Sequence, residues 1–325
     1  MSSRQPPLPL LALALTLAGV VPAVWAQSSA TQSTATATAP WRAVVRATLV
    51  VAPQPGQGGK RLELSALGWN PLANELLAVS DRGRVALVDR MLKPGESGLA
   101  RLQPWRRLPP GMPHNAEGLA WRASGAGGEW LLATEPSPGA FRLSAGPSFD
   151  KAAVPPLPWP QTLSERLAQG GRHGVEALAW HGQHGLLAAA QRPEPAVAVG
   201  EPAIHVLHAL HGVWRLPAQG SQSHLKAIEV LADGTVLLLE RTRLRGSSAG
   251  FHSQLRWLDL GSCGGPALCE APTVAFAPPM EAAFFNDEGL ACTPTLLCWI
   301  VNDDGAASVP GTRLLQFQLV RNEAR

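Results

Sequence analysis

Carboxylates recur in this chain at the two ends of paired apolar runs. In the stretch 117–135, Glu117 opens one run, a Gly-rich turn follows, and Glu135 closes the second run. Because the start of one strand of an antiparallel pair lies beside the end of the other, both acids should share one end of a hairpin. The pattern predicts that seven acids gather at one place: Asp81, Glu117, Glu135, Glu176, Glu240, Glu288 and Asp303.

Carboxylates that share one site repel each other unless a cation neutralises them. Hard oxygen ligands in a flexible ring suit Ca²⁺, so we predict Ca²⁺ as a cofactor with these ligands: Asp81, Glu135, Glu176, Glu240 and Asp303. Arginines follow several of the strand ends, and such groups bind anionic esters: Arg82, Arg192 and Arg241. Either Glu117 or Glu288 would then orient a water molecule as general base.

An alternative interpretation is that each acid caps a turn. Capping needs no acid at both ends of one hairpin, so the recurrent set also fits a functional site. Ser65, Gln191 and Lys226 interrupt the pattern. Three histidines spaced by three, at 205, 208 and 211, alternate between the faces of a strand and do not converge on one metal.

Five repeated units position these residues. Aligned positions in them are 69, 121, 180, 230 and 292, which are 52, 59, 50 and 62 residues apart. A period in the fifties is typical of a four-stranded propeller blade. The last unit lacks a strand and residues 42–51 lack a partner, so the N-terminal strand should complete the last blade.

The predicted fold is therefore an all-β propeller with five four-stranded blades, a sixth being left open in the region 136–173. One helix is predicted over residues 162–169, with Thr162 and Glu165 as a capping box. Trp69, Trp121 and Trp180 end the first strands of three units, where we expect them to pack between blades.

The N-terminus has the features of an export signal. Residues 1–26 combine Arg4, an apolar run and a small-residue cleavage site, which predicts a signal peptide. Residues 27–40 are low-complexity and predicted to be disordered, which leaves 41–325 as the propeller domain. We expect an exported protein, periplasmic or secreted, with no membrane span in the mature chain and a monomeric state.

The net charge and the cysteine content limit the classes of partner that this protein can bind and the compartment in which it can work. The net charge is +3 and the basic residues are scattered, so no nucleic-acid footprint is seen. The cysteines form two close pairs, and an oxidising compartment favours the disulfides 263–269 and 292–298 among three connectivities. The expected partner is a small anionic ester, as substrate or ligand.

The motifs SALGW…LLAVSDRG, NAEGLAW…LLATEPSP, GVEALAW…LLAAAQRP, KAIEVLADGTVLLLER and NDEGLA…WIVNDD resemble the phytase-like family, described as "esterase-like activity of phytase". The resemblance covers roughly residues 60 to 305. It implies an exported, propeller-like protein whose acidic positions carry phosphoesterase activity. The positions it implies are Asp81, Arg82, Glu117, Glu135, Glu176, Glu229, Glu240, Arg241, Glu288, Asn302 and Asp303.

This sequence departs from the family at Gln191, where a Glu is usual. The leading interpretation is a hydrolase of a phosphoester or related anionic ester at a Ca²⁺ site in the channel mouth. Two alternatives stay open: a non-catalytic ligand- or partner-binding propeller with structural calcium, and a lactonase-like hydrolase using the same metal site.

Overall fold

Short runs of Leu, Val, Ala and Trp between turn residues form strands, as the sequence predicts. The computed structural model describes residues 39–52, 61–89, 99–109, 112, 114–125, 127–135, 139–144, 154–170, 174–243, 250–265, 267–277, 286–305 and 311–323. These all belong to the compact unit Ala37–Arg325. The predicted signal peptide and nearly all of the predicted low-complexity segment lie outside the described residues.

Five successive groups of strands make up this unit, with one helix in the described residues. The first group is β2 (Leu64–Asn70), β3 (Glu75–Ser80), β4 (Arg84–Asp89), β5 (Leu99–Leu102) and β6 (Arg106–Arg107). The second is β7 (Ala116–Ser124), β8 (Gly127–Thr134), β9 (Gly139–Ser144) and β10 (Val154–Pro158), followed by α1 (Gln161–Gly170). The third is β11 (Val175–His181), β12 (Gly185–Ala190), β13 (Ile204–Ala209) and β14 (Gly212–Pro217).

The fourth group is β15 (Ser223–Val230), β16 (Val236–Arg243), β17 (Phe251–Leu258) and β18 (Thr273–Ala277). The fifth is β19 (Asp287–Cys292), β20 (Leu297–Asn302) and β21 (Arg313–Arg321), to which β1 (Trp41–Ala52) is added. Within each group, successive strands pair antiparallel, except that β6 pairs with β4 beside β5.

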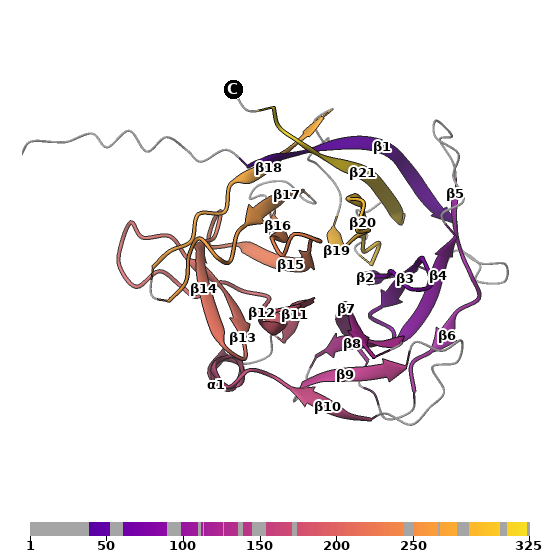
Figure 1. The fold of residues 1–325 in the computed structure, drawn as a ribbon, viewed down its shortest axis with the longest axis horizontal. Helices are drawn as coiled ribbons and strands as arrows, with labels where there is room; N and C mark the ends of the chain where they lie inside the picture. The colour runs from indigo at the N-terminus through magenta and orange to yellow at the C-terminus, as the bar shows by residue number, and fades with distance from the viewer. Residues whose placement is uncertain are drawn as a thin grey trace, which may run out of the picture. The chain divides into compact units, whose positions relative to one another are not determined.

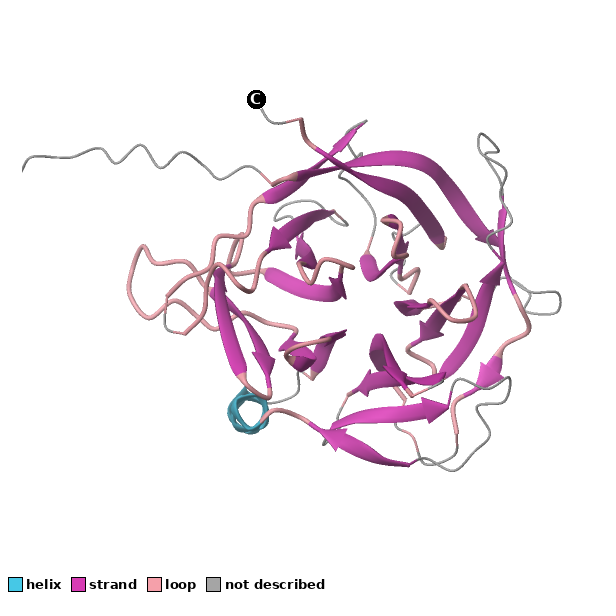
Figure 2. Ribbon diagram, in the orientation of Figure 1, coloured by secondary structure: helices cyan, strands magenta, loops and turns pink. Residues whose placement is uncertain are grey.

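The first strand of each group lies innermost (Figure 1). These inner strands contact each other in the cyclic order β2, β7, β11, β15, β19 and back to β2, and the outer strands surround them (Figure 2). The predicted β-propeller is therefore confirmed. In the region where a sixth blade was left open, β9 and β10 complete the second group; residues 145–153 are not described, so five remains our prediction for the blade count.

The N-terminal strand completes the last group, as predicted. β1 pairs antiparallel with β21, from Trp41 opposite Arg321 to Val50 opposite Arg313. Its two ends also make short parallel pairings, with β18 and with β5. A strand from the start of the domain thereby joins the last group to its neighbours on both sides.

Apolar side chains fill the spaces between neighbouring groups. One cluster joins the first and second groups through residues such as Val79 and Trp130, and four similar clusters join the other neighbours in turn around the axis. Since every core is shared by two groups, no group buries its apolar surface alone. The inner strands are held in place from both sides.

The two predicted disulfides, Cys263–Cys269 and Cys292–Cys298, are present. The predicted helix is also confirmed, but its capping box is wrong. Thr162 lies within α1, where its Oγ1 is 2.9 Å from His208 Nδ1, and Glu165 accepts a hydrogen bond from Gln161. Among the described residues, no helix has the length and apolar content needed to cross a membrane.

Candidate functional site

A β-bulge interrupts the start of every inner strand. The pairing register shifts by one residue between the first and second strands of all five groups. A bulge leaves one residue unpaired and turns its side chain out of the regular alternation. The five unpaired positions, which we call the bulge residues, are Ser65, Glu117, Glu176, Lys226 and Glu288.

Four bulge residues line one narrow space between the inner strands, of about 10 Å³: Glu117, Glu176, Lys226 and Glu288. Ser65 has another role, because its hydroxyl donates to the carbonyl oxygen of Ala116 in the next inner strand. Two glycines follow bulge residues at close strand contacts. A Cβ on Gly118 would lie 2.9 Å from the Glu176 carbonyl oxygen, and one on Gly289 would lie 2.7 Å from the Leu67 nitrogen. A side chain at either position would therefore clash with the neighbouring inner strand.

In one part of this site, which we call the compensated half, the acidic and basic charges balance. Its members are Glu176, Lys226, Arg241 and Glu288. Lys226 Nζ contacts Glu176 and lies 2.6 Å from Glu288 Oε2. Arg241 pairs with the other oxygen of Glu288. All four residues are at most 9% exposed. Buried charges are tolerated when they are paired and hydrogen-bonded, and here both conditions are met.

Neutral partners complete the compensated half. Gln191 donates to Glu176 Oε1, and Asn286 accepts from Arg241. The departure from the family at Gln191 thus supplies a hydrogen-bond donor where a second carboxylate would meet Glu176. Glu288, predicted as a general base, is held between two cations, which makes it an anchor for Lys226 and Arg241.

The remaining acids, the acidic half, are Asp81, Glu117, Glu135 and Asp303. Burial raises the pKa of Glu117 to about 9, and the charges of Glu176, Glu135 and Asp81 add to this rise against the opposing effect of Lys226. Burial, followed by the charges of Glu63 and Asp303, raises the pKa of Asp81 to about 7. Asp81 Oδ1 is buried without a hydrogen-bond partner. The negative charge of these four acids is therefore not fully neutralised by the neighbouring basic side chains.

Two asparagines hold members of the acidic half in place. Asn115 Nδ2 donates to Glu135 Oε2 at 3.0 Å, and Asn286 Nδ2 donates to Asp303 Oδ2 at 2.9 Å. Sequence reasoning missed both, although each lies two residues before a bulge glutamate in the repeated pattern N-x-E-G. Burial also raises the pKa of Asp303.

Glu240 belongs to a different cluster from the one predicted. Its carboxylate accepts from the Gln219 backbone at 2.8 Å and from Arg256 at 3.0 Å, and lies 3.1 Å from His205 Nε2. Burial would raise the pKa of Glu240, but His205 and Arg256 outweigh it and lower this pKa to about 2. Its oxygens are thus occupied by neighbouring side chains, and it lacks the free oxygens expected of a calcium ligand.

The two other predicted arginines lie outside the compensated half. Arg82 is exposed and pairs with Glu63, another residue that sequence reasoning missed. Arg192 is exposed, and its carbonyl oxygen accepts from Arg166 at 3.1 Å. Of the three predicted arginines, only Arg241 is brought into contact with the bulge residues.

The donor chemistry of the acidic half suits a hard cation, because it offers carboxylate oxygens in excess of positive charge. In the part of the chain that the structure describes, no three or more His, Cys, Asp or Glu side chains are arranged as a metal cage. Calcium binding would therefore require these side chains to draw together. Asp81 Oδ1, which is buried without a hydrogen-bond partner, would gain a partner in such a rearrangement.

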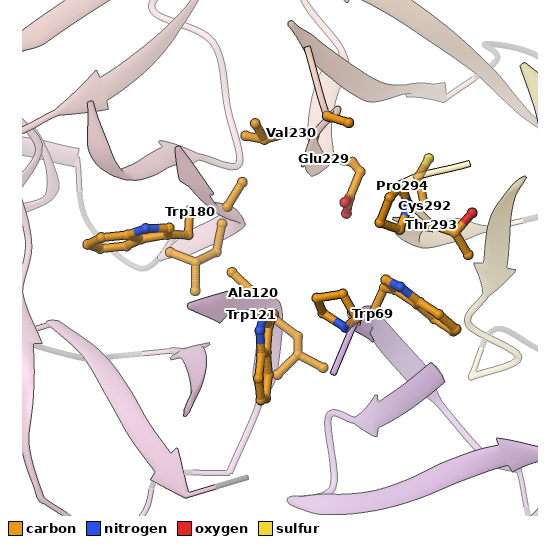
Figure 3. Close-up of a pocket in the computed structure, with 15 residues that line it drawn as sticks. Trp69, Ala120, Trp121, Trp180, Glu229, Val230, Cys292, Thr293 and Pro294 are labelled. Carbon is orange, nitrogen blue, oxygen red and sulfur yellow. The ribbon is translucent and has the colours of Figure 1, made fainter. Parts of the chain in front are cut away.

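One residue implied by the family resemblance, Glu229, lies at the other end of the inner strands from the bulge residues. Three residues beyond Lys226 on β15, it lines a cavity with Trp69, Trp121 and Trp180 (Figure 3). The resemblance implied Glu229 without giving its place in the fold. The three Trp residues do pack between groups as predicted, each against a core cluster that two neighbouring groups share, but they also form the walls of this cavity.

Solved structures of propeller proteins are similar to this chain at low identity. An α-L-arabinofuranosidase from Podospora anserina matches with 13% identity and a TM-score of 0.49, covering 87% of this chain and 98% of that chain. A mannose phosphorylase from Leishmania mexicana matches with 11% identity and a TM-score of 0.43, covering 85% and 88%. The Pan2 WD40 domain of Neurospora crassa matches with 11% identity and a TM-score of 0.40, covering 81% and 79%. None of these likenesses enters the functional argument.

No curated protein matches the chain significantly. A family model does: "esterase-like activity of phytase" matches residues 62–306, which span both the compensated and the acidic half. On the strength of this match, which covers most of the sequence, the chain belongs to the phytase-like family.

Proposed function

We propose that this protein is an exported hydrolase that cleaves a phosphoester or related anionic ester at the end of the inner strands where the bulge residues lie. The observation that carries the proposal is the division of this end into two halves. Lys226 and Arg241 are fixed by Glu176 and Glu288, while Glu117 and Asp81 have strongly raised pKa values. Titratable groups in one site whose pKa values are pushed apart are typical of acid–base catalysis.

Glu117 is suited to donate a proton. With a pKa of about 9, its carboxyl group is protonated at neutral pH. A protonated carboxyl beside an ester can protonate the leaving oxygen, so we assign Glu117 as general acid, in place of the general base expected from the sequence. Asp81, with a pKa of about 7, holds either a proton or a cation near neutral pH.

Calcium is the cation we propose for the acidic half, with Asp81, Glu135 and Asp303 as its ligands. When bound, Ca²⁺ would neutralise the surplus negative charge and polarise the ester oxygen. Glu176 and Glu240 leave the predicted ligand set because a cation already pairs with each, Lys226 with Glu176 and Arg256 with Glu240. Glu135 and Asp303 accept hydrogen bonds from neutral donors alone in the described residues, so their negative charge stays uncompensated. Arg82, exposed directly after Asp81, would contact the anionic group of the substrate.

Export agrees with the covalent structure. Two disulfides are present, and structural disulfides persist in oxidising compartments such as the periplasm and the extracellular space. Together with the predicted signal sequence, they support a periplasmic or secreted enzyme. Mass spectrometry of the protein from an export-competent host would show whether the mature chain starts after residue 26.

A substrate screen tests the enzyme claim. We expect turnover of p-nitrophenyl phosphate or bis-p-nitrophenyl phosphate that needs Ca²⁺ and is lost with EDTA. Glu117→Gln should lower kcat by roughly 100-fold on an alkyl phosphoester such as glycerol phosphate, whose leaving oxygen needs the proton, and much less on the p-nitrophenyl esters, whose leaving group departs without one. Glu165→Gln, on the exposed face of α1, is the matched control and should leave kcat unchanged. Absence of turnover on every phosphoester, with and without Ca²⁺, would refute phosphoester hydrolysis.

The compensated half, in which every charge is already paired, is also compatible with a purely structural role in closing the channel. In that case the protein is a non-catalytic propeller that binds a ligand or partner, and its calcium is structural. EDTA should then lower the Tm, and no substrate should be turned over. A lactonase-like enzyme would instead hydrolyse a γ-lactone and leave both phosphoesters intact. Including p-nitrophenyl acetate and γ-butyrolactone in the screen separates the three functions.

A further inference from the structure

The cavity at the other end of the inner strands, which we call the Trp cup, is built from strand ends of all five groups. It has a volume of about 180 Å³, and its walls include Trp69, Trp121, Trp180, Glu229 and Thr293. This end carries no bulge residue. Its residues follow the regular alternation of the inner strands. Leu119 and Leu178 lie between the cup and the space lined by the bulge residues and contribute to the lining of both.

Glu229 is the one ionisable side chain among the described residues that line the Trp cup. In Figure 3 its carboxylate points to the middle of the space between Trp180, Trp121, Trp69 and Pro294. Desolvation raises the pKa of Glu229 to about 8, and a hydrogen bond from the Cys292 backbone opposes this only in part. No Lys, Arg or His side chain is among the described lining residues, so the cup itself supplies no counter-charge.

The walls of the Trp cup are supported from behind. Trp69 stacks on Trp299 with ring centroids 5.7 Å apart, and Trp121 meets Trp130 edge-on at 4.9 Å. The guanidinium of Arg122 lies 4.9 Å from the centre of the Trp180 ring. Because these side chains are fixed by their neighbours, the cup is formed before any ligand enters, which reduces the entropy lost on binding.

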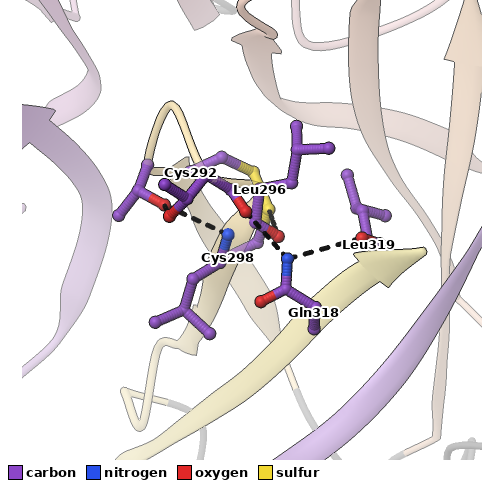
Figure 4. Close-up of a disulfide and its surroundings, with 8 residues drawn as sticks. Cys292, Leu296, Cys298, Gln318 and Leu319 are labelled. Atoms are coloured by element: carbon purple, nitrogen blue, oxygen red, sulfur yellow. Dashed lines mark hydrogen bonds between the residues drawn. A yellow bond between two sulfur atoms is a disulfide. The ribbon is translucent and has the colours of Figure 1, made fainter.

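The Cys292–Cys298 disulfide fixes the wall beside Glu229. It joins the end of β19 to the start of β20, next to Thr293 and Pro294 of the lining. Gln318 holds the same turn by donating to the Thr295 carbonyl at 2.8 Å. Its amide also lies 3.4 Å from the carbonyl oxygen of Leu319, its neighbour on β21 (Figure 4). A covalent link at this point keeps the Cys292 backbone in reach of the Glu229 carboxylate.

We propose that the Trp cup binds a small organic cation, with its ammonium group at Glu229 and its apolar substituents against the tryptophans. Charge complementarity selects the class, because a single carboxylate among three tryptophan side chains favours a cation that also has apolar surface. A bare metal ion is disfavoured, since Glu229 and Thr293 are the only described lining residues with side-chain oxygens. The volume is below the ~300 Å³ of pockets for drug-sized ligands, so the cation should have only a few carbon atoms.

Calorimetric titration with tetramethylammonium and butylammonium tests the proposal, with neopentyl alcohol as the neutral probe. We expect saturable binding of at least one cation and weaker binding of the alcohol. Glu229→Gln should weaken cation binding at least tenfold. Glu75→Gln is the matched control, because Glu75 lies at the same end of the molecule on β3 but does not line the cup. It should leave binding unchanged.

Protonation of Glu229 competes with the cation, so affinity should rise between pH 6 and pH 8, by up to about tenfold per pH unit. The ¹³C shift of the Glu229 carboxyl group in the wild type gives a second readout, because cation binding should move it to the ionised value. This readout needs no folded variant. The proposal is overturned if no cation binds, if Glu229→Gln binds equally well, or if the alcohol binds as tightly as the cations.

Discussion

The two ends of the inner strands carry different kinds of chemistry on the same five strands. At one end, bulges turn Glu117, Glu176, Lys226 and Glu288 toward each other, and Lys226 and Arg241 neutralise part of the acid. At the other end, the Trp cup surrounds a single carboxylate, Glu229. The compensated half of the first end balances its own charge, whereas the acidic half and the Trp cup each depend on a proton or a ligand. Charge in the compensated half should therefore support folding, and charge in the Trp cup should support binding.

Loss of the Lys226 ammonium group should have the largest effect on the free energy of unfolding. Lys226→Met would leave Glu176 and Glu288 buried with one fewer cation, which should lower the free energy of unfolding by about 3–5 kcal/mol. Urea denaturation measures this loss. The double variant Lys226→Met/Glu176→Gln should recover part of it, because one uncompensated charge is removed.

Glu229→Gln is the control for this contrast, since it removes a charge from the Trp cup that has no cationic partner among the lining residues. It should leave the free energy of unfolding unchanged or raise it at pH 8–9. The contrast between the two ends is wrong if Lys226→Met lowers the free energy of unfolding by less than about 1 kcal/mol. It is also wrong if Glu229→Gln lowers this free energy as much as Lys226→Met does.

Removal of the Cys292–Cys298 disulfide should have the next largest effect. The double serine variant loses a short covalent loop of sequence separation 6, which should lower the free energy of unfolding by about 2 kcal/mol. Because Cys292 lines the Trp cup, cation binding should weaken several-fold while phosphoester turnover stays the same. Loss of turnover with intact cation binding would mean that the two ends are assigned the wrong way round.

The pH dependence of stability should report Glu117. Its pKa is about 9 in the folded protein and 4.5 in the unfolded chain. Between these values the unfolded chain has lost a proton that the folded chain keeps, so stability should fall as pH rises from about 5 to 9. Asp81, with a pKa of about 7, contributes to the same fall at the lower part of this range.

Thermal unfolding of the wild type and Glu117→Gln across this range, in EDTA, measures the contribution of Glu117. The variant should show a shallower fall in Tm, and added Ca²⁺ should restore wild-type stability most at high pH, where protons compete least. An identical pH slope in the variant and the wild type would remove Glu117 from the explanation.

The smallest effect on stability is expected for Arg82. Its pair with Glu63 is at the surface, so Arg82→Ala should change the free energy of unfolding by less than about 1 kcal/mol. If Arg82 contacts the substrate anion, KM should rise several-fold while kcat changes less. A normal KM would assign the exposed arginine to the Glu63 pair alone.

The repeats made most of the fold predictable. Apolar runs with a period in the fifties predicted the propeller, the unpaired run at 42–51 predicted the closing strand β1, and close cysteine pairs predicted both disulfides. All of these depend on local pattern or on the count of strands. The capping box failed because a tertiary contact with His208 took the hydroxyl of Thr162.

The site was only partly predictable, because a bulge is not visible in the pattern of apolar residues. The convergence of Glu117, Glu176, Lys226 and Glu288 agrees with the sequence, since all open their units. The resemblance implied Glu229 as a functional residue but did not indicate at which end of the strands it lies. Glu240 was grouped with the other acids because its partner His205 lies in another unit, 35 residues away. Pairings between distant side chains cannot be read from the chain.

A calcium titration compares the two ends most directly. Calorimetry on the wild type, Glu117→Gln, Asp81→Asn and Glu229→Gln under the same conditions would show where the ion binds. Our account predicts that Glu229→Gln binds Ca²⁺ as tightly as the wild type, that Asp81→Asn loses at least tenfold in affinity, and that Glu117→Gln changes the pH dependence of binding. Equal affinity in Asp81→Asn and the wild type, or a loss confined to Glu229→Gln, would contradict it.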